Sequence, residues 1–526
     1  MRRSPASDEV QTQFNAGKLS FFQNTANMDV SRLYRWSTKT SLNVAFGGEF
    51  RSEVFRIDAG EPNSYNNGLR LAHVDSIRPY PGMTAYTTFP VAVATASGSQ
   101  VFPGFKPQDA VRASRNVYAA YGDLELTMGR LLLDGALRYE DYAEKGFRYD
   151  NLSGKLSARY EIGPWFSVRG SLSNGFRAPS LHQLYFQNTS TQFVNAQPSN
   201  SLTANNYNPI VRDAFGIREL KPETSTSLTV GLCGKVGSGI EFTVDAYFIS
   251  IRDRIVLSTA FNRSNPLVNT ILNSNHVDSS TSALQFWTNA VNTETRGIDA
   301  VVTDKVRVGR GNASISVAAN FNQNRVVGGI HTNSVIDDPK NNPSVHDPSA
   351  NPANDLGATL FDRQQRGRIE TAQPNSKISL VLTYAIGHWE FLTRNVRFGR
   401  VQYLNNVDPR LVNKSTGAYF NDIALGTDQE FGAKVITDVV VTYRFKRGIA
   451  LSVGGNNIFD IYPDKVYVDP RNNLAAVHAN PIAGANKTAG GYNSGRDASN
   501  RGRFLFNPNQ FGFNGRFLFS RVSVSF

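Results

Sequence analysis

The sequence predicts an all-β protein, an antiparallel up-and-down transmembrane β-barrel of which about fifteen strands are present. Apolar and polar side chains alternate along many runs, and several runs exceed the roughly ten residues that a tilted membrane-crossing strand needs. Short turns alternate with long loops. The chain contains no apolar run of about 18 residues, so the prediction relies on strands.

The clearest alternation lies in residues 131–185. Leu133 and Tyr139 fall on one face of a strand, and Asp134 and Arg138 fall on the other. Side chains point to opposite faces of a strand in turn, so this period of two predicts strands rather than helices. A soluble sandwich also alternates in this way. Strand length and loop asymmetry must therefore separate the two classes.

The strand-like runs cover most of the chain. They lie near residues 18–33, 40–57, 115–128, 131–142, 154–162, 166–176, 223–235, 240–253, 287–306, 313–325, 376–386, 389–400, 433–445, 449–456 and 516–526.

Connections between these runs alternate in length. Short turns such as Gly129-Arg130 and Gly163-Pro164 are followed by long loops rich in Asn, Ser, Gly and Pro. The long loops span residues 58–114, 177–222, 254–286, 326–375, 401–432 and 457–515. A barrel with one periplasmic and one external rim gives this alternation, whereas a soluble all-β protein has no reason to keep its long loops at one end.

The direction of the strands predicts an incomplete barrel. If residues 516–526 run toward the periplasm, residues 18–33 do so too, yet a complete barrel begins with an upward strand and has an even strand count. The first residues, MRRSPASDEVQTQFNAG, lack the apolar segment of a signal peptide. We therefore expect at least one preceding strand to be missing.

Composition points away from other classes of function. The net charge of +12 is spread along the chain, which makes nucleic-acid binding a weak hypothesis. Cys233 is the single cysteine, and the seven histidines lie far apart without metal-ligand spacing. We expect no catalytic residues, no metal site and no cofactor, and therefore no enzyme.

Three arginines form the most notable charge cluster. Arg363, Arg366 and Arg368 lie in the segment DRQQRGRIE. One interpretation is a solvated run of charge, and the other is a guanidinium set that contacts an anionic ligand or carboxylates inside the barrel. In an extended strand, the even-numbered Arg366 and Arg368 would share a face.

Several motifs together resemble one family. The segment SLSNGFRAPSLHQLY, residues 171–185, closely resembles a barrel motif of TonB-dependent outer-membrane receptors. The matching residues are Gly175, Phe176, Arg177, Ala178, Pro179, Ser180, Leu181, Leu184 and Tyr185. Family-like segments follow in order at Leu220–Gly231, Asn289–Asp299, and Asn456, Asn457, Ile458, Phe459, Asp460 and Tyr462. The terminal Phe526 is similar to an outer-membrane targeting signal.

The resemblance implies a barrel of roughly 22 strands with an amino-terminal plug inside it. This sequence shows neither a plug-like region nor a TonB-binding segment, so we expect residues 1–526 to be one partial barrel domain. The implied location is the bacterial outer membrane. The implied partners are the TonB system through the missing plug region, outer-membrane lipids and the barrel assembly machinery. Arg177 is expected to fix its loop to the barrel wall.

The resemblance implies receptor or transporter function, with binding followed by energy-driven plug movement. The first hypothesis is uptake of a large scarce ligand such as a ferric siderophore. The alternatives are an oligosaccharide importer that works with a surface lipoprotein, and a non-transporting surface adhesin or structural barrel. Loop aromatics that would suit sugars are Tyr65, Phe102, Phe105, Tyr207, Tyr419 and Tyr492. The sequence leaves the ligand open.

Overall fold

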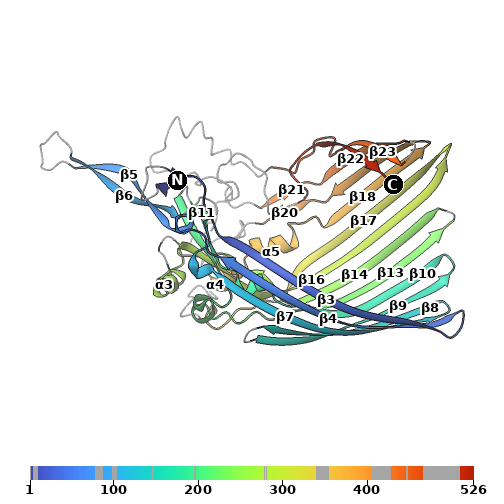
Figure 1. Cartoon of the computed structure of the whole chain (residues 1–526), viewed down its shortest axis with the longest axis horizontal. Helices are drawn as coiled ribbons and strands as arrows, with labels where there is room; N and C mark the ends of the chain where they lie inside the picture. Colours follow the sequence, from blue (N-terminus) through green and yellow to red (C-terminus); the bar gives the residue numbers. More distant parts are fainter. Residues whose placement is uncertain are drawn as a thin grey trace, which may run out of the picture.

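The protein is built on one large, curved, barrel-type β-sheet, with two-stranded sheets and other small folded elements gathered at one end (Figure 1). This computed structural model describes residues 2–3, 10–77, 87–97, 103–144, 147–194, 197–237, 239–277, 279, 281–338, 355–404, 428–445, 448–465 and 510–525.

Fifteen long strands pair antiparallel, each with the next in the following order. They are β3 (Lys18–Arg35), β4 (Thr40–Asp58), β7 (Val111–Met128), β8 (Leu131–Glu144), β9 (Phe147–Gly163), β10 (Phe166–Arg177), β13 (Glu223–Val236), β14 (Ile240–Leu257), β16 (Thr281–Val308), β17 (Gly311–Val327), β18 (Ser376–Ile386), β19 (Trp389–Phe398), β22 (Lys434–Arg444), β23 (Ile449–Asn456) and β24 (Phe517–Val524). Each corresponds to one of the fifteen predicted runs, so the predicted barrel wall is confirmed.

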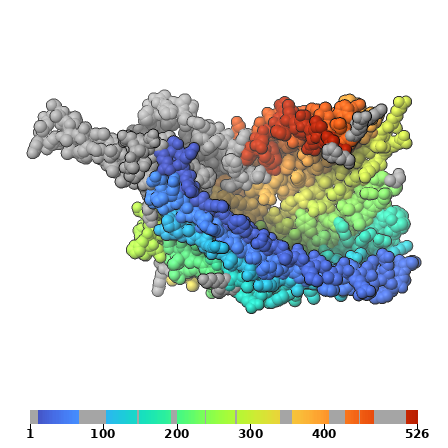
Figure 2. Space-filling model, viewed as in Figure 1, coloured from blue at the N-terminus to red at the C-terminus, as the bar shows by residue number. Residues whose placement is uncertain are grey.

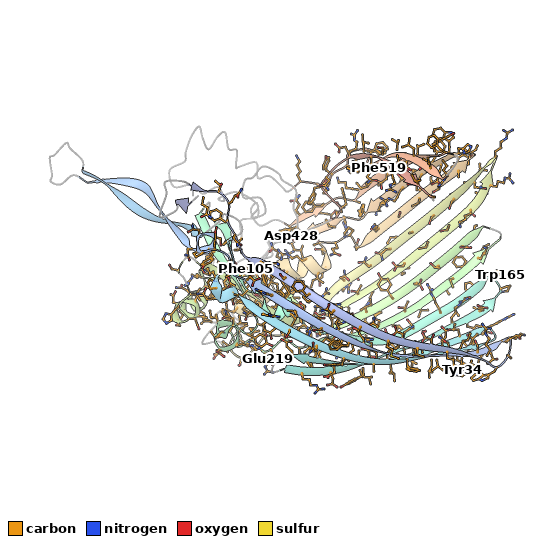
Figure 3. All side chains as sticks on the ribbon, viewed as in Figure 1. Tyr34, Phe105, Trp165, Glu219, Asp428 and Phe519 are labelled. Atoms are coloured by element: carbon orange, nitrogen blue, oxygen red, sulfur yellow. The ribbon has the colours of Figure 1, made fainter. Side chains whose placement is uncertain are left out.

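The two ends of the sheet differ as predicted. We call the end with the tight connections, such as Gly129-Arg130, the turn end, and the opposite end the loop end. Tyr34 and Trp165 lie at the turn end, whereas Phe105 and Glu219 lie toward the loop end (Figure 3). The space-filling view shows β3 and β4 along the front and the last strands at the top (Figure 2).

The long loops contain secondary structure that the sequence did not predict. Near the loop end lie α1 (Pro62–Tyr65), β5 (Asn67–Ile77), β6 (Thr87–Ser97), η1 (Pro107–Asp109), α2 (Leu181–Tyr185), β11 (Asn188–Val194), β12 (Gln197–Ala204), η2 (Ile210–Ala214), β15 (Phe261–Asn262), α3 (Pro266–Ser274), α4 (Leu356–Leu360), α5 (Arg363–Glu370), β20 (Val401–Tyr403) and β21 (Gln429–Phe431). Strands β1 (Arg2–Arg3) and β2 (Val10–Gln11) form a separate pair. Among the described residues, none of the helices has the length and apolar character that crossing a membrane requires.

The wall has one apolar face and one charged face. On β4 and β7, Phe50 and Tyr118 are paired in register and are 41% and 50% exposed. The adjacent positions, Glu49 and Arg51, form an ion pair of 3.2 Å on the other face. A barrel in a membrane needs lipid on its outer face and water on its inner face, so the apolar side chains face outward.

Exposed aromatic side chains mark the turn end. Trp36, Trp165 and Trp389 are all exposed there, together with Tyr34 and Tyr160. Amphipathic rings at one edge of an apolar belt are typical of a membrane–water interface. The turn end therefore has the character of a membrane–water interface.

Candidate functional site

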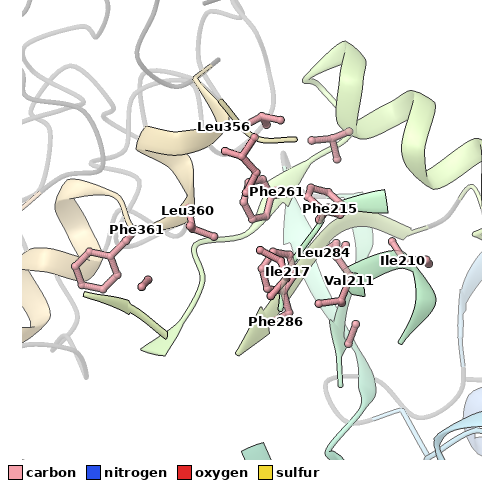
Figure 4. Close-up of a cluster of buried hydrophobic side chains, with 14 of the residues drawn as sticks. Ile210, Val211, Phe215, Ile217, Phe261, Leu284, Phe286, Leu356, Leu360 and Phe361 are labelled. Atoms are coloured by element: carbon pink, nitrogen blue, oxygen red, sulfur yellow. The ribbon is translucent and has the colours of Figure 1, made fainter. Parts of the chain in front are cut away.

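The loop end holds the largest buried apolar cluster in the described part of the chain, which we call the rim cluster. Connections β10–β13, β14–β16 and β17–β18 all contribute to it. Its fully buried members include Val211, Phe215, Phe261, Leu284 and Phe286 (Figure 4). The rings of Phe261 and Phe286 stack with centroids 5.5 Å apart. Loops that share a core hold one shape, because moving one exposes the apolar surface of the others.

The family-like motif at the end of β10 continues into helix α2 and caps the start of that helix. The Gln183 N–H donates to Ser180 Oγ at 3.1 Å, and the Ser180 N–H donates to Gln183 Oε1 at 3.0 Å. This reciprocal capping box satisfies backbone donors that a helix start leaves free. Leu181 and Leu184 then pack into a second buried cluster with Phe55 of β4. The motif thus fixes a loop onto the wall.

Arg177, the motif arginine, pairs with Glu223 across the β10–β13 ladder. Arg177 Nε lies 3.0 Å from Glu223 Oε2, and Glu223 is 6% exposed. Glu223 also accepts a hydrogen bond of 2.7 Å from the Ile255 N–H. Both carboxylate oxygens are therefore used within the wall, and Glu223 joins β13 to its neighbours β10 and β14.

A buried ion pair lies directly beneath α2. Arg115 Nη2 on β7 lies 2.6 Å from Glu53 Oε2 on β4, and Arg115 Nη1 donates to the Pro179 carbonyl at 2.6 Å. Tyr149 Oη is 2.9 Å from the same guanidinium. A buried charge is tolerated only where its donors are matched in this way. Arg115 therefore ties the motif loop to the inner face of the wall.

The arginine cluster lies on helix α5, so the prediction that Arg366 and Arg368 share a strand face is wrong. Side chains two positions apart on a helix point in nearly opposite directions. Arg363 forms an ion pair with Asp428 with an Nη1–Oδ1 distance of 2.6 Å. Arg366 contacts Glu370 at 3.0 Å and the Val326 carbonyl of β17 at 3.1 Å. Arg368 donates to Gln365 at 3.0 Å and is exposed.

The last of the family-like motifs forms the turn after β23. Asn457 and Asp460 adopt φ angles of 49° and 57°, a left-handed region that Asn and Asp tolerate better than most residues. Asn457 bonds the backbone of Ile461 in both directions, at 2.7 and 2.9 Å. Asp460 Oδ1 accepts from the Arg516 N–H at 2.8 Å. Phe459 is exposed and Asn456 ends the strand.

The loop aromatics that would suit sugars are partly covered. The ring of Tyr207 has Tyr185 stacked on one side at 5.1 Å and the Arg212 guanidinium at 5.0 Å. Phe105 packs edge-on against Phe186. Phe102, Tyr419, Tyr492 and the terminal Phe526 lie outside the described residues.

Burial perturbs three titratable groups in the loop-end elements. It raises the pKa of Asp362, the N-cap of α5, and of Asp109 in η1. It lowers the pKa of His182, whose ring stacks on Phe186 at 4.5 Å. No group of carboxylate, histidine or cysteine side chains suited to a metal ion occurs among the described residues.

Two features of the loop end escaped the sequence analysis. The apolar side chains of the rim cluster follow no regular period in the sequence. The number of large apolar residues in the long loops is the sequence feature that could have indicated a buried cluster there. Helix α5 carried a local signal: Asp362 caps it by accepting from the Gln365 N–H at 2.9 Å. A capping residue three positions before a Gln often starts a helix.

Three of the solved structures that resemble the chain are each about twice its length. A variant of the ferric enterobactin receptor PfeA from Pseudomonas aeruginosa has 13% identity and a TM-score of 0.53, over 97% of this chain and 54% of that one. The outer membrane transporter YddB from Escherichia coli has 11% identity and a TM-score of 0.53, over 85% and 51%. The siderophore receptor PirA from Acinetobacter baumannii has 12% identity and a TM-score of 0.51, over 97% and 55%.

These likenesses establish the fold, and the chain spans about half the length of the structures it matches. No curated protein matches the chain. A family model described as "TonB dependent receptor-like, beta-barrel" matches residues 4–458. With the fifteen-strand wall and the ordered motifs, this match establishes that the chain belongs to the TonB-dependent receptor-like β-barrel family of the bacterial outer membrane.

Proposed function

We propose that the chain forms the wall and outer loops of a receptor for TonB-energised uptake of a large scarce ligand, with a ferric siderophore as the first candidate. The observation that carries this proposal is the rim cluster, in which three connections fold together at the loop end. Loops held over a charged interior offer a fixed surface for capturing a ligand before it enters the barrel. Binding, rather than covalent chemistry, is the role we assign, so the chain is no enzyme.

A ferric chelate is favoured over an oligosaccharide for two reasons. Two of the similar solved structures are named as a ferric enterobactin receptor and a siderophore receptor. In addition, the Tyr207 ring contacts Tyr185 and Arg212, and Phe105 is packed against Phe186, which leaves fewer aromatic surfaces for sugar stacking.

Arg368 is the ligand contact that we propose among the three arginines. Arg363 is paired with Asp428 and Arg366 with Glu370, whereas Arg368 donates a hydrogen bond to the uncharged Gln365. A guanidinium that is exposed beside the rim can meet an anionic chelate at low desolvation cost. Arg363 and Arg366 instead fix α5, and a carboxylate of the plug region is the other proposed partner of this cluster.

The experiment is uptake in the bacterium that carries the gene. The reading frame is deleted and then restored in its native form, and accumulation of iron-55 from a panel of ferric siderophores is measured with and without an uncoupler of the proton-motive force. We expect one chelate to lose most of its uptake in the deletion strain, to regain it on restoration, and to lose it with the uncoupler. Unchanged uptake of every chelate would contradict the siderophore assignment. If the uptake that depends on this reading frame is unaffected by the uncoupler, TonB coupling is contradicted.

A further inference from the structure

The outward face of four neighbouring strands changes from apolar to polar in three successive rows. The apolar row contains Val230, Ala246, Ile298 and Phe321, paired across β13, β14, β16 and β17. The next row toward the loop end, which we call the boundary row, contains Leu228, Phe248, Arg296 and Gln323. The polar row beyond it contains Thr226, Ser250, Glu294 and Arg325.

The boundary row marks a depth in the membrane. Val230, Ile298 and Phe321 are 57%, 49% and 48% exposed, as side chains in contact with lipid tails should be. One row higher, the Arg296 side chain is 66% exposed. An isolated arginine is costly in hydrocarbon but favourable at the headgroup level. The change from Ile298 to Arg296 therefore places this row where the acyl chains of the outer leaflet meet their headgroups.

A groove of about 630 Å³ opens at the same place. Phe248, Arg296, Ile298 and Phe321 line it, and Gly297 contributes backbone. Gly297 has no room for a side chain, because an added Cβ would lie 2.3 Å from Tyr247 Oη. The groove is thus apolar on its turn-end side and cationic on its loop-end side.

The charges around the groove favour an anion. The Arg296 guanidinium lies 5.2 Å from the ring centroid of Phe248, which holds it over the groove. Arg296 Nη2 also lies 3.0 Å from Glu294 Oε2. Arg325 is exposed and stands opposite Glu294 in the register. Arg296 and Arg325 outnumber the single carboxylate of Glu294 here, so this part of the wall carries a net positive charge.

We propose that this groove is a binding site for a phosphate-bearing acylated lipid of the outer leaflet. An acyl chain lies along Phe321 and Ile298, and the headgroup phosphate contacts Arg296 and Arg325. Arginine binds phosphate well because its planar donors fit the oxygens in pairs. The site depends on the membrane location of the family and is independent of which ligand the receptor takes up.

The test uses the full chain folded in detergent micelles, with lipid A that carries its phosphates as the probe. Each arginine near a charged membrane surface adds roughly fivefold to binding, so Arg296→Ala and Arg325→Ala should each weaken binding about fivefold. Arg296→Lys keeps the charge and should retain most of the binding. Lipid A with its phosphates removed should bind the native chain as weakly as the double alanine variant does.

Arg307→Ala provides the matched control, because Arg307 is an exposed arginine at the turn end of β16. It should bind lipid A like the native chain. Equal loss in Arg307→Ala and Arg296→Ala would mean that general charge attraction explains binding, and the proposal would fail. If inorganic phosphate displaces lipid A and binds with the same affinity, the groove is a site for free phosphate, and the lipid assignment is overturned. Circular dichroism confirms that each variant retains its strands, and Phe321→Ala tests the acyl contact without altering charge.

Discussion

Arg115 and Glu53 form an ion pair that is almost completely buried between β7 and β4, with 5% and 8% of their side chains exposed. Their contact joins two wall strands to the motif loop through the Pro179 carbonyl. The two residues are 62 positions apart in sequence and directly opposed in the β-ladder.

Removing one partner of this pair should be costly. Arg115→Met leaves the Glu53 carboxylate buried without its counter-ion, which typically costs about 3–5 kcal/mol. The measurement is urea unfolding of the chain in detergent micelles, followed by tryptophan emission. Arg169→Met is the control, because its pair with Asp245 is 44% and 21% exposed and should contribute no more than about 1 kcal/mol. Equal destabilisation by the two variants would contradict the importance of burial.

The capping box of α2 should be separable from its apolar packing. Ser180→Ala removes the acceptor for the Gln183 N–H and should cost about 1 kcal/mol, whereas Ser180→Asp keeps an acceptor and should cost much less. Hydrogen exchange of the α2 amides measures the difference. If Ser180→Ala leaves amide protection unchanged, the packing of Leu181 and Leu184 alone fixes this helix.

His182 should make the loop end sensitive to acid. Burial lowers its pKa from the ordinary 6.5, so the unfolded chain takes up the proton at a higher pH than the folded chain. Its stabilising contribution is complete above pH 6.5 and is lost progressively as the pH falls below that value. His182→Phe keeps an aromatic ring against Phe186 and should reduce the loss. Hydrogen exchange of α2 above and below pH 6.5 tests this, and identical acid responses in both proteins would disprove it.

Gly231 should be intolerant of a side chain for a specific reason. An added Cβ would lie 2.0 Å from Asp245 Oδ1 and 3.0 Å from Arg169 Nε, so it would displace that ion pair. Gly231→Ala should destabilise the wall by about 1–3 kcal/mol, and Asp245→Ala in the same chain should restore part of the loss. Gly122→Ala is the matched control, since nothing lies within 4 Å of its added Cβ. An additive double variant would show that the clash is not the cause.

The wall could be predicted because its signal is local and repeated. Each strand alternates between lipid and water, so pairs such as Phe50 and Arg51 reveal the two faces without knowledge of the neighbouring strands. The rim cluster could not be predicted in this way. Phe215, Phe261 and Phe286 come from three segments whose meeting depends on the curvature of the whole sheet.

Helix α5 shows a different kind of failure. Its arginines suggested a strand face because the surrounding protein consists of strands, yet eight residues capped by Asp362 form a helix. For the motif residues, the sequence predicted their positions better than their roles. Sequence similarity located Gly231, Ser180 and Asp460, but their roles depend on the folded structure: Gly231 leaves space for an ion pair, Ser180 caps a helix and Asp460 anchors a strand.

The hydrogen bond from the Arg516 N–H to Asp460 has an evolutionary consequence. Two points 56 residues apart in the chain are fastened together where β23 ends and β24 begins, and Gly515 permits their close approach with a φ of 67°. Whatever is inserted between these two points leaves and rejoins the wall at one place. Natural selection can therefore exchange, lengthen or shorten the segment between them while β24 keeps its register.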